Sequence, residues 1–234
     1  MRYNNIYEAK FLSRPNRFIA RVSLQGKEET VHVKNTGRCR ELLIPGARVV
    51  LEESSNPARK TRFDLVCVYK PEVGWINIDS QAPNQVVKEW LKYQMSEKGN
   101  PKRCLFQNLT AFQPEYVFGS SRLDFYLLEG EEKCLMEVKG VTLEKEGMGY
   151  FPDAPTLRGV KHLEELIRGL SMGYRCYLAF VIQMEGISMV KPNISTHPEF
   201  GEVLERAKNA GVHILYLLCK VTREELEILE VRED

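Results

Sequence analysis

Two acids and a lysine stand where metal-assisted chemistry on a phosphate group would need them. Glu137 and Lys139 are two positions apart in the strand-like stretch CLMEVKGV, so their side chains project from the same face. Asp124, in the preceding stretch RLDFYLL, reaches that face if the two strands pair as a hairpin. Two carboxylates are a minimal site for Mg²⁺, and a neighbouring lysine can orient a metal-bound water or offset charge on a phosphate.

A plainer interpretation of these three residues stays open. A carboxylate at a strand end and a solvated Glu–Lys pair are common on protein surfaces, and such a pair contributes little to stability. The pattern E-x-K also recurs by chance. The elements around Asp124, Glu137 and Lys139 must therefore decide between a reactive site and an ordinary surface.

The helix expected over residues 158–170 offers further polar side chains. Its apolar stripe has the spacing i, i+3, i+4, i+7, and Asp153 lies just before it in the stretch FPDAPT. The face opposite the stripe is either solvated or, at Arg158 and His162, turned toward the phosphate. Asp153 either approaches the same site or caps the helix. This opposite face consists of Arg158, Lys161, His162 and Glu165.

The C-terminal two thirds of the chain predict one mixed sheet flanked by helices. A joint is expected at SQAPNQ, where Asn84 can cap a helix that begins at Gln85. A three-strand meander and a loop over 142–156 come next, and a last helix is expected after a capping box of Thr222 and Glu225. Between that loop and the last helix we expect a helix over 158–170, a strand over 176–184, a helix over 199–211 and a strand over 212–221.

The N-terminal third is rich in short strands and predicts a small barrel. A helical turn is expected in TGRCRELLIPG, and five strands with one short helix are typical of an OB-fold; an SH3-like barrel or a small sandwich are the alternatives. We therefore divide the chain into an OB-fold-like domain, residues 1–83, and a second domain, residues 84–234. The five expected strands cover 17–24, 29–35, 47–54, 63–70 and 74–79.

Positive charge gathers in the N-terminal domain. Residues 1–83 hold 14 Lys and Arg against 9 Asp and Glu, whereas the remainder holds 19 against 23. Clustered cations on a small barrel suit a groove that follows a phosphate backbone, with Phe18 and Trp75 as candidates for base stacking, although barrel aromatics are more often core. The candidate nucleic-acid-binding residues are Arg14, Arg17, Lys34, Arg38, Arg40, Arg59, Lys60 and Arg62.

Composition narrows the class of protein further. The chain has 234 residues and no apolar run near the roughly 20 residues of a membrane span. Its first residues lack the apolar core of a secretory signal, so we expect a cytoplasmic protein without membrane association. Six scattered cysteines and four histidines show no ligand spacing, which argues against disulfide bonds and a zinc cluster.

The order of elements resembles the PD-(D/E)XK nuclease superfamily, whose α-β-β-β-α-β core corresponds to residues 84–183. Longer stretches, among them VHVKNTGRCRELLIPGARVVLE, MEVKGVTLE and FPDAPTLRGVKHLEEL, resemble the sugar fermentation stimulation protein family of bacteria and archaea. That resemblance covers nearly the whole chain and implies an OB-fold joined to a PD-(D/E)XK-like domain, DNA binding, and a link to maltose use.

The resemblance also implies roles for individual residues. The nuclease-like acids fall on Asp124 and Glu137, which would bind Mg²⁺ or Mn²⁺, and the lysine falls on Lys139. An additional acid from the first helix would be Glu89, with Glu115 on the first strand as the competing choice. Gln183 stands where some superfamily members hold a polar residue after the fourth strand.

Three functional hypotheses follow. The first is a metal-dependent nuclease that hydrolyses phosphodiester bonds in DNA, either single- or double-stranded. The second is a non-catalytic, largely non-specific DNA-binding regulator of sugar metabolism, whose nuclease-like domain is structural. The third is RNA or nucleotide chemistry on the same scaffold.

Overall fold

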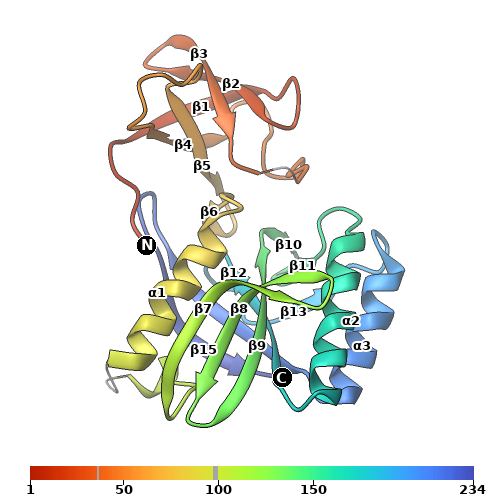
Figure 1. Ribbon diagram of the computed structural model, residues 1–234. Helices are drawn as coiled ribbons and strands as arrows, with labels where there is room; N and C mark the ends of the chain where they lie inside the picture. The colour runs from red at the N-terminus through yellow and green to blue at the C-terminus, as the bar shows by residue number, and fades with distance from the viewer. Residues whose placement is uncertain (36, 97–99) are drawn as a thin grey trace.

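The computed structural model describes residues 1–35, 37–96 and 100–234 and contains two parts, an N-terminal barrel and a larger α/β part (Figure 1). In the barrel sheet the strand order is β3-β2-β1-β4-β5-β6, and parallel pairing of β3 with β5 closes it. The expected five-stranded OB barrel is thereby confirmed. Its strands are β1 (Ile6–Ser13), β2 (Ile19–Leu24), β3 (Lys27–Val33), β4 (Arg48–Glu53) and β5 (Phe63–Lys70), with β6 (Gly74–Asn77) added at the edge.

Two details of the barrel differ from the sequence prediction. Strand β1 was not expected, and the stretch GWINID, expected as the fifth barrel strand, forms the added strand β6. The stretch expected to hold a helical turn forms, in its described part, a hydrogen-bonded turn in which the Leu43 N–H donates to the Cys39 carbonyl at 2.9 Å. Cys39 and Leu42 on this turn are buried and close one end of the barrel core.

The second part is built on a six-stranded sheet with the strand order β15-β14-β12-β9-β8-β7. The mixed sheet predicted from the sequence is thereby confirmed. Strands β9, β12 and β14 run parallel, and the outer pairs are antiparallel. The strands are β7 (Leu109–Phe118), β8 (Ser121–Glu129), β9 (Glu132–Val141), β12 (Arg175–Ile182), β14 (His213–Val221) and β15 (Leu226–Glu233).

Helices cover both faces of this sheet (Figure 1). The α1 helix packs on one face, against Met136 and Val138, while α2 packs on the other, against Leu135, and α3 packs against α2. Alternation along β9 therefore turns Glu137 and Lys139 toward the α2 side. The helices are α1 (Ala82–Ser96), α2 (Leu157–Ser171) and α3 (Pro198–Ala210), and a short 3₁₀ helix, η1, spans Pro101–Arg103.

Three local predictions in the second part are wrong. The α1 helix begins at Ala82, so Asn84 lies in its first turn instead of capping it. The expected loop contains β10 (Leu143–Lys145) and β11 (Met148–Phe151), and β11 pairs with β13 (Val190–Pro192). The expected last helix is strand β15, because Leu226 and Ile228 alternate into the core with a period of two.

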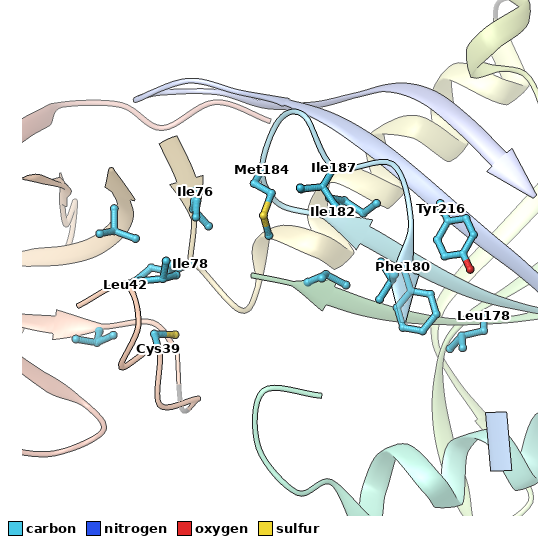
Figure 2. Packing of buried hydrophobic residues seen from close by; sticks show 14 of the residues in the cluster. Cys39, Leu42, Ile76, Ile78, Leu178, Phe180, Ile182, Met184, Ile187 and Tyr216 are labelled. Carbon is cyan, nitrogen blue, oxygen red and sulfur yellow. The ribbon is translucent and has the colours of Figure 1, made fainter. Parts of the chain in front are cut away.

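One hydrophobic cluster runs from the barrel into the sheet. Figure 2 shows Leu42 and Ile78 on the barrel side of this cluster, and Met184 and Ile182 on the side of β12. Gln183, between the last two, is 2% exposed and donates from its amide to the Asn77 and Asp79 carbonyl oxygens and to Asn77 Oδ1. The barrel is therefore joined to the end of β12 by both apolar packing and buried hydrogen bonds.

None of the helices within the described ranges has the length and apolar character that crossing a bilayer requires.

Candidate active site

The β8–β9 hairpin brings the two predicted acids together. Its last register pair joins Phe125 to Met136, so the next positions, Asp124 and Glu137, stand opposite each other just where the ladder ends. There the Asp124 carboxylate replaces the missing ladder bond, because its Oδ2 accepts the Val138 N–H at 2.7 Å. The regular pairing of the two strands therefore ends at the two acids.

Asp124 is held from a second side by the first helix. Asn84 Nδ2 donates to Asp124 Oδ1 at 2.7 Å. Burial, and then the neighbouring Glu137 charge, raise the pKa of Asp124 to about 6, while the bonds from Val138 and Asn84 oppose that shift. The two carboxylates thus repel each other in the absence of a cation, as expected for a pair built to share one.

Glu137 is the most deeply buried acid of the site, with 2% of the residue exposed. Lys139 Nζ donates to its Oε1 at 2.5 Å, and His162 Nδ1 bonds the same oxygen. Burial would raise the pKa of Glu137, but the Lys139 charge and the His162 contact outweigh it and hold the pKa below its usual value. The other oxygen, Oε2, is buried and has no hydrogen-bond partner among the described residues.

His162 belongs to the site and not to a solvated helix face. It is 4% exposed, and Arg158 Nε donates to its Nε2 at 3.3 Å. Because the guanidinium can only donate, Nε2 accepts, and Nδ1 carries the proton that is donated to Glu137. The solvated interpretation is also wrong for Glu165, which is buried and accepts the Ser120 hydroxyl at 3.1 Å.

Asp124, Glu137 and Lys139 line a cavity of about 380 Å³ between the barrel and the second part. The barrel contributes Asn35 and Gly37, and α2 contributes Arg158. Lys139 has 13% of its side chain exposed. A volume of this size suits one small ligand or one unit of a polymer. The wall is completed by Ser80, Pro83, Asn84, Asp124, Glu137, Val138, Lys139, Gly140, Thr142, Phe151, Asp153 and Gln183.

The remaining predicted accessory residues divide into two groups. Asp153 and Gln183 line the cavity. Burial raises the pKa of Asp153. The Gln183 amide donates to the Asn77 carbonyl oxygen at the junction with the barrel. Glu89 is exposed and pairs with the amino group of Met1 at 2.7 Å, so the structure does not bring it into the site. Glu115 is exposed beside Arg122 at 3.3 Å; it is absent from this cavity but lines a neighbouring one of about 340 Å³ that Asn84 and Asp124 also line.

The helix residue that does reach the acids is Asn84, which sequence reasoning had treated as a cap. The available signal was its position at the start of the first helix, where a polar side chain can face the ends of the neighbouring strands. Its contact with Asp124 joins positions 40 residues apart, so only the packing of α1 on the sheet reveals it.

The eight predicted cationic residues also divide by their contacts. Arg14 donates to backbone carbonyls, and Lys34 lies within 3.5 Å of Asp64 and Asp79. Arg59 and Arg62 are paired at 2.7 Å with Asp64 and Glu53 respectively. These four stabilise the barrel. The other four, which are exposed and have no carboxylate within ion-pair distance among the described residues, are Arg17, Arg38, Arg40 and Lys60.

The donor set fits a hard divalent cation with few protein ligands. No group of three or more His, Cys, Asp and Glu side chains with metal-binding geometry occurs in residues 1–35, 37–96 and 100–234. A closed zinc site would need four such ligands in tetrahedral geometry. Two carboxylates, one with an unpartnered oxygen, match instead the one or two protein ligands that Mg²⁺ takes while keeping its waters.

Comparisons with known proteins agree with this architecture. Residues 12–78 match the family model for the SfsA N-terminal OB domain, and residues 81–225 match that for the sugar fermentation stimulation protein RE domain. Sugar fermentation stimulation protein homologs from Desulfitobacterium hafniense and Clostridium beijerinckii are 54% and 50% identical, each over 97% of this chain and at least 95% of the relative. The structure of Pyrococcus furiosus SfsA in complex with Ca²⁺ superposes with a TM-score of 0.82 at 25% identity, covering 100% of this chain and 95% of that one. The chain therefore belongs to the sugar fermentation stimulation protein family, with an N-terminal OB domain and a restriction-endonuclease-like domain.

Proposed function

We propose that this protein is a Mg²⁺- or Mn²⁺-dependent nuclease that hydrolyses phosphodiester bonds in DNA. Asp124 and Glu137 would hold the cation, and the exposed arginines of the barrel would hold the nucleic acid. The observation that carries the proposal is the buried, unpartnered Oε2 of Glu137, opposite Asp124 and on the wall of a cavity. Leaving such an oxygen unsatisfied costs about 1–3 kcal/mol, a cost that a bound cation would remove.

Support for a cation also comes from the related archaeal protein, whose structure was determined with Ca²⁺. Ca²⁺ and Mg²⁺ are both hard cations that prefer oxygen ligands, although Mg²⁺ is smaller and keeps more of its water. The Asp124 and Glu137 carboxylates are oxygen donors of this kind. A bound cation would polarise the phosphate and lower the pKa of a water molecule that attacks it.

The remaining side chains have separate tasks in this proposal. Lys139 neutralises Glu137 before the substrate binds, and its ammonium is placed to stabilise charge that develops on the phosphate. His162 and Asn84 fix the orientations of Glu137 and Asp124. The Arg158 guanidinium lines the cavity and bonds His162 through Nε, so its outer nitrogens are available to a phosphate oxygen.

Cleavage assays test this proposal. Supercoiled plasmid, linear duplex, single strands and branched DNA are each incubated with Mg²⁺, with Mn²⁺ and with EDTA. We expect cleavage by the wild type only with metal, and a loss of roughly 100-fold or more in Lys139→Met, the magnitude typical of removing one transition-state donor. DNA affinity should change little, because one ammonium is a small part of a contact with many phosphates.

Lys133→Met is the matched control for this assay. Lys133 lies on the same strand, is exposed, and makes no ion pair among the described residues. Equal trace cleavage by the wild type and the Lys139 variant would indicate contamination and remove the support for catalysis. Tight DNA binding without cleavage of any substrate would contradict the nuclease and favour a DNA-binding regulator linked to sugar metabolism.

A further inference from the structure

Arg14 lines a small pocket on the barrel and joins the two segments that form it. Its two terminal nitrogens donate to the carbonyl oxygens of Asn35 at 2.6 Å, Arg38 at 2.7 Å, Arg17 at 2.8 Å and Gly37 at 2.9 Å. A single guanidinium therefore holds the 14–17 segment against Asn35, Gly37 and Arg38. Because each segment carries further arginines, this clamp gathers positive charge at one place.

The pocket formed in this way has a volume of about 240 Å³ and is lined by Arg17, Arg38 and Arg40, with Asn16 and Leu43. None of these three guanidinium groups has a carboxylate within 4.0 Å among the described residues. Holding three like charges together without counter-charges is unfavourable unless an anion binds between them. Arg59 and Arg62 on the same barrel, by contrast, both have acidic partners.

The arginine pocket borders the candidate active site. Gly37 lines both cavities, and a Cβ atom added there would lie 2.2 Å from Asp153 Oδ2 on the opposite wall. Only a glycine allows the barrel segment to approach Asp153 so closely. A chain of phosphates could therefore run from the arginines across Gly37 to Asp124 and Glu137.

We propose that the pocket of Arg17, Arg38 and Arg40 binds a backbone phosphate of the strand whose neighbouring phosphate lies in the candidate active site, and that this strand is single-stranded DNA. The inference rests on the proposed function for the position of the cleaved phosphate. Phe18 supports a stacking contact, because its ring is 46% exposed and lies beneath the Arg17 guanidinium, 5.0 Å from the ring centroid. An exposed aromatic ring beside arginines is the usual platform for an unpaired base.

The burial of Glu137 favours single-stranded DNA over duplex DNA as the ligand. Glu137 is 2% exposed and lies at the wall of a cavity of about 380 Å³, which suits one nucleotide unit and not a paired duplex. A duplex is stiff, so it would have to bend or deform before one of its phosphates entered this cavity. A flexible single strand can enter it without that deformation.

Binding measured without catalysis tests the inference. A fluorescein-labelled 15-nucleotide single strand and the matched duplex are titrated in EDTA at several salt concentrations. We expect the wild type to bind the single strand at least roughly tenfold more tightly than the duplex. Arg38→Ala combined with Arg40→Ala should lower single-strand affinity by about tenfold or more and reduce the slope of log K against log salt by about 0.7, the contribution of the one single-strand phosphate that the pocket would hold.

Lys10→Ala combined with Lys27→Ala is the charge-matched control, because both lysines are exposed on the barrel and neither lines the pocket. We expect this variant to bind within about twofold of the wild type, and thermal unfolding should show all three proteins folded. Equal losses in the two double variants, or wild-type affinity in the arginine variant, would overturn the pocket. Duplex binding as tight as single-strand binding would overturn the single-strand assignment. Since no metal is present, a failure of the nuclease proposal would leave these outcomes unchanged and would be seen separately in the cleavage assay.

Discussion

The Glu137 carboxylate and the His162 imidazole are in direct hydrogen-bond contact, although they lie 25 residues apart on β9 and α2. The contact fixes one oxygen of Glu137 and leaves the other directed to the region that a cation would occupy. In turn, Arg158 determines which ring nitrogen of His162 carries the proton. The candidate site is therefore supported by a chain of contacts that begins on α2.

Replacing His162 with Asn should weaken cation binding. The loss of the imidazole removes a donor from Glu137 Oε1, and outer partners of metal ligands typically contribute about 10- to 100-fold to affinity. Titration calorimetry with Mn²⁺ measures this change. His213→Asn is the control, since His213 is half-buried, contacts Glu233 and does not line the cavity. Unchanged affinity in the His162 variant would show that the contact does not position Glu137 for a metal.

Replacing Asp124 with Asn should stabilise the metal-free protein in a pH-dependent way. Because the folded pKa, about 6, exceeds the usual 3.8, the folded state binds protons more tightly and loses stability as pH rises from about 4 to above 6. The wild type thus carries a penalty of at most about 3 kcal/mol at pH 7, from 1.36 kcal/mol per pKa unit. Urea unfolding in EDTA should show Asp124→Asn more stable than the wild type at pH 7 and equally stable at pH 4. A variant advantage that is the same at both pH values would contradict the raised pKa.

The two alternative acids should be dispensable for metal binding. Glu89 pairs with the Met1 amino group and Glu115 lies beside Arg122, so Glu89→Gln and Glu115→Gln should keep Mn²⁺ affinity within about twofold. Glu137→Gln should abolish binding under the same conditions, since it removes one of only two carboxylates. A clear loss of affinity in the Glu115 variant would restore the sequence-based alternative of an accessory acid on the first strand of the meander.

Gln183 should act on stability and not on the chemical step. Its Nε2 lies 2.9–3.1 Å from three acceptors on Asn77 and Asp79 at the barrel junction and shares its two N–H groups among them, so Gln183→Ala leaves buried acceptors unpaired. We expect a loss of about 1–3 kcal/mol in the free energy of unfolding. Gln113→Ala, at an exposed position on β7, is the matched control. Normal stability combined with impaired cleavage would instead support the accessory catalytic role that the resemblance implied.

The general architecture was accessible from sequence because it depends on local patterns. Period-two alternation identified β8, in which Leu123, Phe125 and Leu127 are buried, and period 3.6 identified α2. The same local logic failed at the C-terminus. Thr222 does accept the N–H groups of Glu224 and Glu225 as a capping residue would, but there it forms the turn between β14 and β15.

The site was predicted in part for a related reason. Asp124, Glu137 and Lys139 lie on adjacent strands, so alternation and hairpin pairing were enough to bring them together. The contacts of Asn84 and of the individual barrel arginines join segments that are distant in the sequence, and no local pattern reveals such contacts. Charge counting alone could not separate Arg14, which is bonded to four carbonyls, from Arg38, which is exposed.

A crystal soaked in Mn²⁺ tests the central claim most directly, because anomalous diffraction locates the ion without reference to activity. We expect an anomalous peak between Asp124 and Glu137, within about 2.5 Å of an oxygen from each carboxylate and including Glu137 Oε2. The Glu137→Gln variant, soaked in the same way, should lack the peak. Mn²⁺ bound only elsewhere on the protein, or absent from the pair at a concentration that saturates binding in solution, would contradict the metal site and the nuclease mechanism that depends on it.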